Sequence, residues 1–142
     1  MTASLSREPS PPPRREFQLP EDDVAALDAL GYWWETIVFA GVRWLLVHDW
    51  PAPAEFTATR VIAAIRIVPG YPAAALDMIY LHPPLQRRDG KPIAGLSDFL
   101  LDGRTYQQWS RHYTATNPWR VGEDDVCAHL RAAEEWLCRA AG

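Results

Sequence analysis

The chain has 142 residues, of which 48% are hydrophobic and 23% charged, and its formal net charge is −4 at pH 7. This length and composition suit one compact domain with a sizeable core. Nucleic acid is excluded as the main partner, because phosphate binding needs a concentrated basic surface and the arginines here are scattered. No apolar run approaches the roughly 18–20 residues of a membrane span, and Met1–Ser10 lacks a secretory signal, so we expect a cytoplasmic protein without a membrane partner.

The first 16 residues contain almost nothing apolar to bury. Ser10 is followed by three prolines and then by Arg14 and Arg15. Segments of this composition do not form a packed core. The sequence therefore predicts a disordered tail over residues 1–16 and a folded domain over residues 17–142. A short proline-rich ligand for another module is the alternative interpretation of the tail.

A short amphipathic helix is predicted to begin after Pro20. Acidic residues at Glu21–Asp23 favour its first turn, and Gly31 stops it. Four segments rich in β-branched and aromatic residues follow, most of them bounded by glycine or proline. They predict strands at Trp34–Ala40, Val42–Trp50, Arg60–Val68 and Ala75–Leu81. Four consecutive strands indicate an antiparallel meander.

The segment from Leu85 to Gly122 shows no clear period and is punctuated by glycine and proline. Five aromatic residues from Phe99 to Trp119 predict that it is a packed, functional loop. A helix from about Asp124 closes the chain. Its predicted buried stripe consists of Val126, Leu130, Ala133, Trp136 and Leu137. The order of elements predicts an α+β fold in which helices cover one face of an antiparallel sheet.

Polar and aromatic residues alternate densely from Tyr106 to Tyr113, which includes Trp109-Ser110-Arg111-His112. Neither a helical nor a strand period explains this pattern, so the segment predicts a site on a loop. Serine needs an adjacent base to act as a nucleophile, and His112 is two residues from Ser110. A turn serine that only hydrogen-bonds the loop is the alternative. Ser97, the other serine of the folded domain, is expected to cap a short helix at 98–101.

The two cysteines, Cys127 and Cys138, both fall in the predicted last helix, eleven positions apart. At that spacing their Cα atoms would be about 16 Å apart, which is too far for a disulfide. Their spacing also matches no zinc motif. We expect two structural helix residues and no metal or cofactor.

The order of elements, the segment Ile67-Val68-Pro69-Gly70-Tyr71-Pro72 before the fourth strand and His82-Pro83-Pro84 after it resemble the ubiquitin-conjugating fold. In that fold a Tyr-Pro pair precedes strand four and a His-Pro-Asn turn follows it. The span from about Leu19 to Leu137 is more closely similar to prokaryotic relatives of the fold, in particular family E. Trp109-Ser110-Arg111-His112, followed by Asn117-Pro118-Trp119-Arg120 and an acidic helix start, is the most particular shared feature.

This sequence departs from the family at the catalytic position. A ubiquitin-conjugating enzyme carries a cysteine roughly ten residues after its His-Pro-Asn turn, and none stands there in this chain. Pro84 replaces the asparagine and supplies no donor for an oxyanion. A thioester at the usual position is therefore excluded. Two interpretations remain within the family: a serine that accepts the acyl group as an oxyester, or a noncovalent scaffold that binds a ubiquitin-like protein or its activating enzyme.

The resemblance implies an enzyme that takes the C-terminal acyl group of a ubiquitin-like protein from an activating enzyme, and it implies a context in antiphage defence. Ser110 is the predicted acceptor, His112 the base or acid, Arg111 an electrostatic aid and Asp102 an orienting carboxylate. A small serine or metal hydrolase that uses His82, His112 and Asp102 is the alternative from outside the family.

Overall fold

The computed structural model describes residues 11–141, so most of the predicted disordered tail lies outside the described residues. The end of that tail is paired with strand β1 (Trp33–Phe39). The amide of Glu16 donates to the carbonyl of Thr36, and the amide of Thr36 donates to the carbonyl of Arg14. Arg14–Glu16 are therefore hydrogen-bonded along the edge of the sheet.

Helix α1 (Glu21–Ala29) begins directly after Pro20, as predicted. Its first turn holds the three acidic residues that favour a helix N-terminus. The helix ends where Gly31 takes a φ of 78°, a left-handed conformation that glycine adopts without a steric penalty. Leu27 anchors the helix, since none of its surface is exposed.

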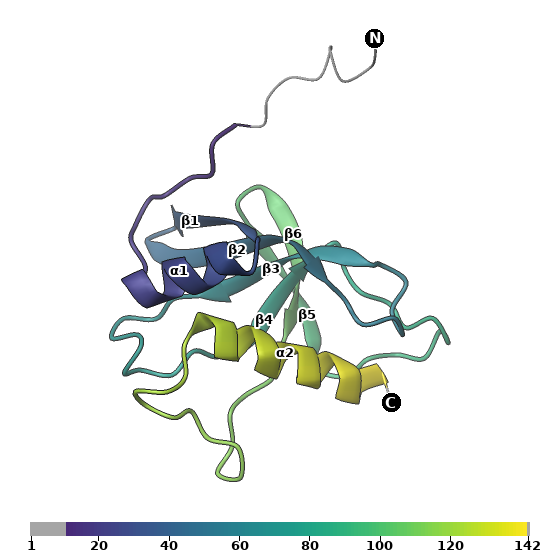
Figure 1. Ribbon diagram of the computed structural model, residues 1–142. Helices are drawn as coiled ribbons and strands as arrows, with labels where there is room; N and C mark the ends of the chain where they lie inside the picture. The colour runs from purple at the N-terminus through teal and green to yellow at the C-terminus, as the bar shows by residue number, and fades with distance from the viewer. Residues whose placement is uncertain (1–10, 142) are drawn as a thin grey trace.

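Six antiparallel strands form one sheet in the order β1-β2-β3-β4-β6-β5 (Figure 1). The strands after β1 are β2 (Val42–Pro51), β3 (Arg60–Arg66), β4 (Ile79–His82), β5 (Leu96–Leu101) and β6 (Arg104–Trp109). The first four are neighbours in chain order, as in the predicted meander. A two-residue turn, Ala40–Gly41, joins β1 to β2, and both residues have the positive φ that a tight hairpin turn requires.

The prediction of four strands is wrong, because a second hairpin lies in the segment predicted to be a loop. β5 and β6 pair over their whole length, from Leu96 opposite Trp109 to Leu101 opposite Arg104. Ser97 therefore lies in a strand and caps no helix. The turn is Asp102–Gly103, with φ values of 52° and 77°, and an Asp-Gly pair is itself a strong hairpin signal. The polar residues of both strands obscured the strand pattern.

Two other predicted boundaries shift. β4 begins at Ile79, four residues later than predicted, because the preceding residue, Met78, has a φ of 61° and interrupts extended backbone. Helix α2 (Val126–Ala141) begins close to the predicted start, and a carboxylate oxygen of Asp125 accepts a hydrogen bond from the amide of Ala128, 2.9 Å away. Its five predicted stripe residues are all buried.

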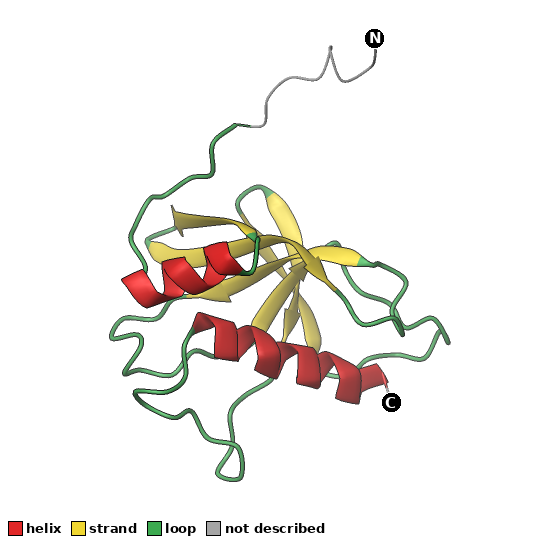
Figure 2. Ribbon diagram, in the orientation of Figure 1, coloured by secondary structure: helices red, strands yellow, loops and turns green. Residues whose placement is uncertain are grey.

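Both helices cover the same face of the sheet, and the main core lies between them and that face (Figure 2). A second apolar cluster lies on the opposite face. There Trp44 of β2 packs against Phe99 of β5, with ring centroids 5.4 Å apart, although β3, β4 and β6 separate these strands in the sheet. The sheet therefore curls, so that the β5–β6 hairpin covers part of its own back face.

Candidate functional site

The Ser110 segment begins where β6 ends. Trp109, which has no exposed surface, fixes the end of the strand, and its indole N–H donates to the side-chain oxygen of Gln107. The amide of Ser110 then donates to the carbonyl of Gly95, 3.0 Å away. Ser110 is thus held by its backbone at the open end of the β5–β6 hairpin, with its side chain exposed.

His112 meets a carboxylate that sequence analysis missed. Its Nδ1 lies 2.8 Å from Oδ1 of Asp77, and both side chains are about half exposed. A backbone hydrogen bond fixes this approach, because the amide of Met78 donates to the carbonyl of Arg111 at 3.0 Å. Asp77 and His112 are 35 positions apart, and only the pairing of β4 with β6 brings them together.

The contact with Asp77 determines what the imidazole can do. A carboxylate accepts a hydrogen bond, so Nδ1 carries the proton and Nε2 of a neutral His112 is free to accept one. Ser110 precedes His112 by two residues, and the amide of Arg111 between them donates to the carbonyl of Trp109 at 3.0 Å, which makes a tight turn at Ser110. A hydroxyl, an imidazole and a carboxylate are the three groups of an activated serine, and the contact that the structure contains is the one between the imidazole and the carboxylate.

Arg111 is tied to the backbone on both sides of the hairpin opening. Its guanidinium donates to the carbonyls of Ser110 and Ala94, at 3.1 and 2.9 Å, and its Cζ lies 5.0 Å from the centre of the Trp109 ring. Partial burial lowers its pKa from the ordinary arginine value. A depression of about 270 Å³, lined by Arg111, Trp136, Arg139 and Ala140, adjoins this guanidinium.

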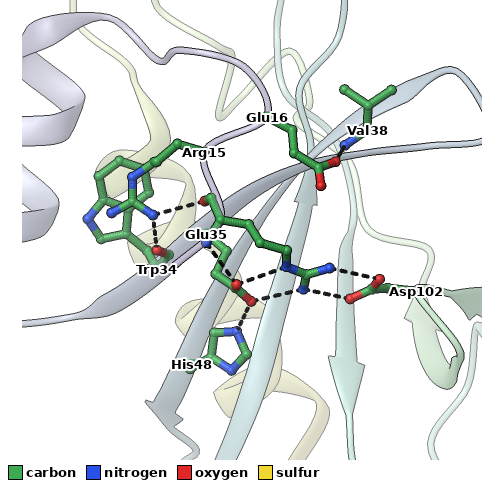
Figure 3. A network of polar contacts seen from close by, with 8 residues as sticks. Arg15, Glu16, Trp34, Glu35, Val38, His48 and Asp102 are labelled. Carbon is green, nitrogen blue, oxygen red and sulfur yellow. Dashed lines mark hydrogen bonds and ion pairs between the residues drawn. The ribbon is translucent and has the colours of Figure 1, made fainter. Parts of the chain in front are cut away.

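Asp102 does not lie with the other predicted site residues. It occupies the β5–β6 turn, while Ser110 lies beyond the opposite end of the six-residue strand β6, which spans about 20 Å. Its two carboxylate oxygens accept hydrogen bonds from Arg14, at 3.0 and 2.8 Å. Figure 3 shows Asp102 at the end of the network around Glu35. Asp102 is therefore not placed to orient His112.

His82 is also separate from this group. Its Nδ1 lies 2.9 Å from the carbonyl oxygen of Thr105, so it anchors the turn after β4 to β6 as a hydrogen-bonding residue. His82, His112 and Asp102 thus have three different neighbourhoods, which removes the geometric basis of the predicted hydrolase site. Within residues 11–141 no group of three or more histidine, cysteine or acidic side chains is placed to hold a metal ion.

His129 of α2 forms hydrogen bonds to residues next to the Ser110 segment. It is fully buried, Nε2 lies 2.7 Å from the carbonyl oxygen of Met78, and Nδ1 lies 2.7 Å from the hydroxyl of Tyr113. A carbonyl only accepts, so Nε2 donates and Tyr113 donates to Nδ1. Burial lowers the pKa of His129 to about 4 and keeps the ring neutral. His129 thus connects α2 to Met78 and to Tyr113.

Neither cysteine belongs to this site. Cys127 is buried in α2, and Cys138 is exposed near the end of the same helix. Burial, and after it the neighbouring carboxylates, raise the pKa of both thiols, so both are poor in the reactive thiolate form. The turn His82-Pro83-Pro84 has no cysteine after it before the β5–β6 hairpin.

No helix among the described residues is both long enough and apolar enough to cross a membrane. The search of curated proteins and the search of solved structures each gave no match. A protein-family model, prokaryotic E2 family E, matches residues 19–140. This span contains α1, the six strands, Ser110, His112, Asp77 and all but the last residue of α2. The chain therefore belongs to prokaryotic E2 family E, whose members are relatives of the ubiquitin-conjugating enzymes.

Proposed function

We propose that this chain accepts the C-terminal acyl group of a ubiquitin-like protein from an activating enzyme and holds it as an oxyester on Ser110. Membership of prokaryotic E2 family E supports the broader role, conjugation of a ubiquitin-like protein. The observation that carries the finer proposal is the 2.8 Å contact between His112 and Asp77, two residues from an exposed serine. Asp77 takes the role that sequence analysis gave to Asp102.

The proposed transfer begins with attack of the Ser110 Oγ on the acyl carbon of a thioester on the activating enzyme. As the new C–O bond forms, the hydroxyl proton moves to Nε2 of His112, and Asp77 stabilises the imidazolium through Nδ1. The tetrahedral intermediate then collapses and its C–S bond breaks. His112 returns the proton to the departing thiolate, so that the cysteine of the activating enzyme is regenerated and Ser110 carries the ester.

Arg111 is the candidate for stabilising the oxyanion, since Pro84 offers neither a side-chain amide nor a backbone N–H. Its guanidinium has five N–H donors, and the carbonyls of Ser110 and Ala94 engage two of its nitrogens. Anchoring on both sides fixes the positive charge beside Ser110. A charge that is already positioned needs no rearrangement during the reaction.

The second candidate function is a noncovalent scaffold for a ubiquitin-like protein or its activating enzyme. The absence of a cysteine after the His82 turn favours it. Of Trp33, Trp34 and Trp50, the last two are buried core residues, and Trp33 is 38% exposed. A docking surface built on these tryptophans therefore reduces to Trp33.

Intact mass measurement distinguishes the two functions. The wild-type protein is incubated with an activating enzyme, a ubiquitin-like protein and ATP beside Ser110→Ala, with Ser97→Ala as the matched control, because Ser97 is the other exposed serine of this hairpin end. We expect a hydroxide-labile adduct on wild type and Ser97→Ala and none on Ser110→Ala. An adduct on all three proteins would overturn the assignment to Ser110, and an adduct on none, with active upstream components, would favour the scaffold.

A further inference from the structure

The outer edge of β1 is occupied by three residues of the same chain. β1 is the first strand in the sheet order, and no strand formed by residues 11–141 lies beyond it. Arg14–Glu16 run parallel to it, and Thr36 exchanges both of its backbone hydrogen bonds with this segment. An unpaired strand edge is a template for adding another extended chain. This edge therefore has the geometry of a strand-addition site, and the N-terminal segment fills it.

Two carboxylates bind the Arg14 side chain. Its guanidinium and backbone amide donate three hydrogen bonds to Glu35, at 2.9 to 3.0 Å, and the guanidinium donates two more to Asp102. The Glu35 side chain is only 6% exposed, and Nε2 of His48 also lies 2.9 Å from its Oε1. Because paired carboxylates match the fork of a guanidinium, this position selects arginine over lysine.

The next two residues, Arg15 and Glu16, are bound by other kinds of contact. The guanidinium of Arg15 lies over the Trp34 ring, with Cζ 3.3 Å from the ring centre, and it donates to the carbonyl of Trp34. The carboxylate of Glu16 accepts a hydrogen bond from the amide of Val38, at 2.8 Å. Figure 3 shows Arg15 beside Trp34 and Glu16 beside Val38 along this strand edge. The Arg15 and Glu16 side chains thus bond the outward-facing backbone of Trp34 and Val38, and the backbone of Arg14 and Glu16 bonds Thr36 between them.

We propose that the outer edge of β1 is a binding site for an extended peptide segment of the type Arg-Arg-acidic, and that Arg14–Glu16 occupy this site in cis. The partner it fits is a protein with such a segment in extended form. The charges support this assignment, since Glu35, Asp102 and the Trp34 ring all attract cations, and the backbone amide of Val38 attracts an anion. The proposal is independent of the chemistry at Ser110, which lies at the opposite end of β6.

Because Arg14–Glu16 of the same chain occupy the site, a segment of another protein must displace them in order to bind. A segment tied to its own site by a short linker competes at an effective concentration on the order of millimolar. Phe17, the next residue, is buried in the core and keeps the segment close to β1. A partner segment should therefore bind weakly to the wild-type chain and well once the arginines of the cis segment are removed.

The test uses the full chain with Arg14→Ala and Arg15→Ala, titrated with a synthetic peptide of residues 11–18. Binding is followed by calorimetry and by the NMR signals of the Thr36 and Val38 amides. We expect one-to-one binding, amide exchange at both residues at least about tenfold faster in the free variant than in wild type, and slow exchange restored by the peptide. The same peptide with Arg14→Lys should bind about tenfold more weakly.

Matched variants of the protein complete the test. Adding Glu35→Gln should abolish peptide binding, whereas adding Asp98→Asn, an equal charge change at an exposed residue of β5, should leave it unchanged. If the double variant does not fold, full-length Arg14→Lys is titrated instead, and its weakened cis contact should still let the peptide bind more tightly than to wild type. Equal affinity for wild type and variant, equal affinity for both peptides, or no change at Thr36 and Val38 would overturn the proposal.

Discussion

Asp77 and Asp102 form a matched pair for substitution, because each carboxylate has one clear partner. Asp77 lies against Nδ1 of His112, and Asp102 accepts two hydrogen bonds from Arg14. We expect Asp77→Asn to slow adduct formation on Ser110 by about 100-fold, since an amide does not stabilise the imidazolium. Asp102→Asn should leave the rate unchanged and lower the free energy of unfolding by about 1–2 kcal/mol. Initial rates from intact mass, with urea unfolding of both variants, check this pair. Equal rate losses would contradict the role given to Asp77.

Substitutions of a second single residue, His129, test how much each of its two hydrogen bonds contributes, because its two ring nitrogens have different partners. His129→Leu leaves the Met78 carbonyl and the Tyr113 hydroxyl unpaired, which should lower the free energy of unfolding by about 2–4 kcal/mol. In His129→Gln the side-chain amide can still donate to Met78, so about half of that loss should be recovered. The NMR signal of the His112 ring reports whether the contact with Asp77 persists. Identical urea midpoints for the two variants would show that the hydrogen bond to Met78 contributes nothing.

At the scale of elements, local pattern predicted α1, α2 and the β1–β4 meander, because each has a periodic apolar face bounded by glycine, proline or acidic residues. The β5–β6 hairpin was missed because its apolar residues do not alternate: Leu100 of β5 is exposed, and Tyr106 and Trp109, the buried residues of β6, are three positions apart. Missing β6 also hid Asp77, since only the pairing of β4 with β6 places Asp77 beside His112. Arg14–Glu16 have the composition of a tail, and what orders them is a buried glutamate in β1 that no local pattern indicates.

The start of the β5–β6 hairpin provides a prediction about this element. Gly95 has a φ of 75°, and a Cβ built on it would lie 2.7 Å from a guanidinium nitrogen of Arg111. Gly90 has nearly the same φ of 76° with nothing within 4 Å, so Gly90→Ala is the control for backbone strain alone. Both variants should lose about 1–2 kcal/mol of stability. Only Gly95→Ala should also displace Arg111 and slow adduct formation. If both variants react at the wild-type rate, Arg111 has no part in the transfer.

At the scale of the whole molecule, the pKa values of two buried groups, Glu35 and His129, predict how the free energy of unfolding decreases as the pH is lowered. The hydrogen bonds from Arg14 lower the pKa of Glu35 from its ordinary 4.5 to about 2, and burial lowers the pKa of His129 from 6.5 to about 4. In both cases the unfolded chain binds a proton at a higher pH than the folded chain does, so each contribution is present at neutral pH and is lost as pH falls. The His129 contribution disappears between about pH 6.5 and 4, and the Glu35 contribution between about pH 4.5 and 2, each on the order of 3 kcal/mol.

Urea unfolding at a series of pH values separates these two windows. Wild type should lose stability in two successive steps from pH 7 to pH 2. His129→Gln should flatten the upper step and retain the lower one, because its amide does not titrate. Glu35→Gln should do the reverse, and Arg14→Ala should weaken the lower step as well, since Arg14 is the first cause of the low pKa of Glu35. A lower step that persists unchanged in Arg14→Ala would mean that the N-terminal segment does not hold the Glu35 charge in solution, and the proposed peptide site on β1 would lose its main determinant.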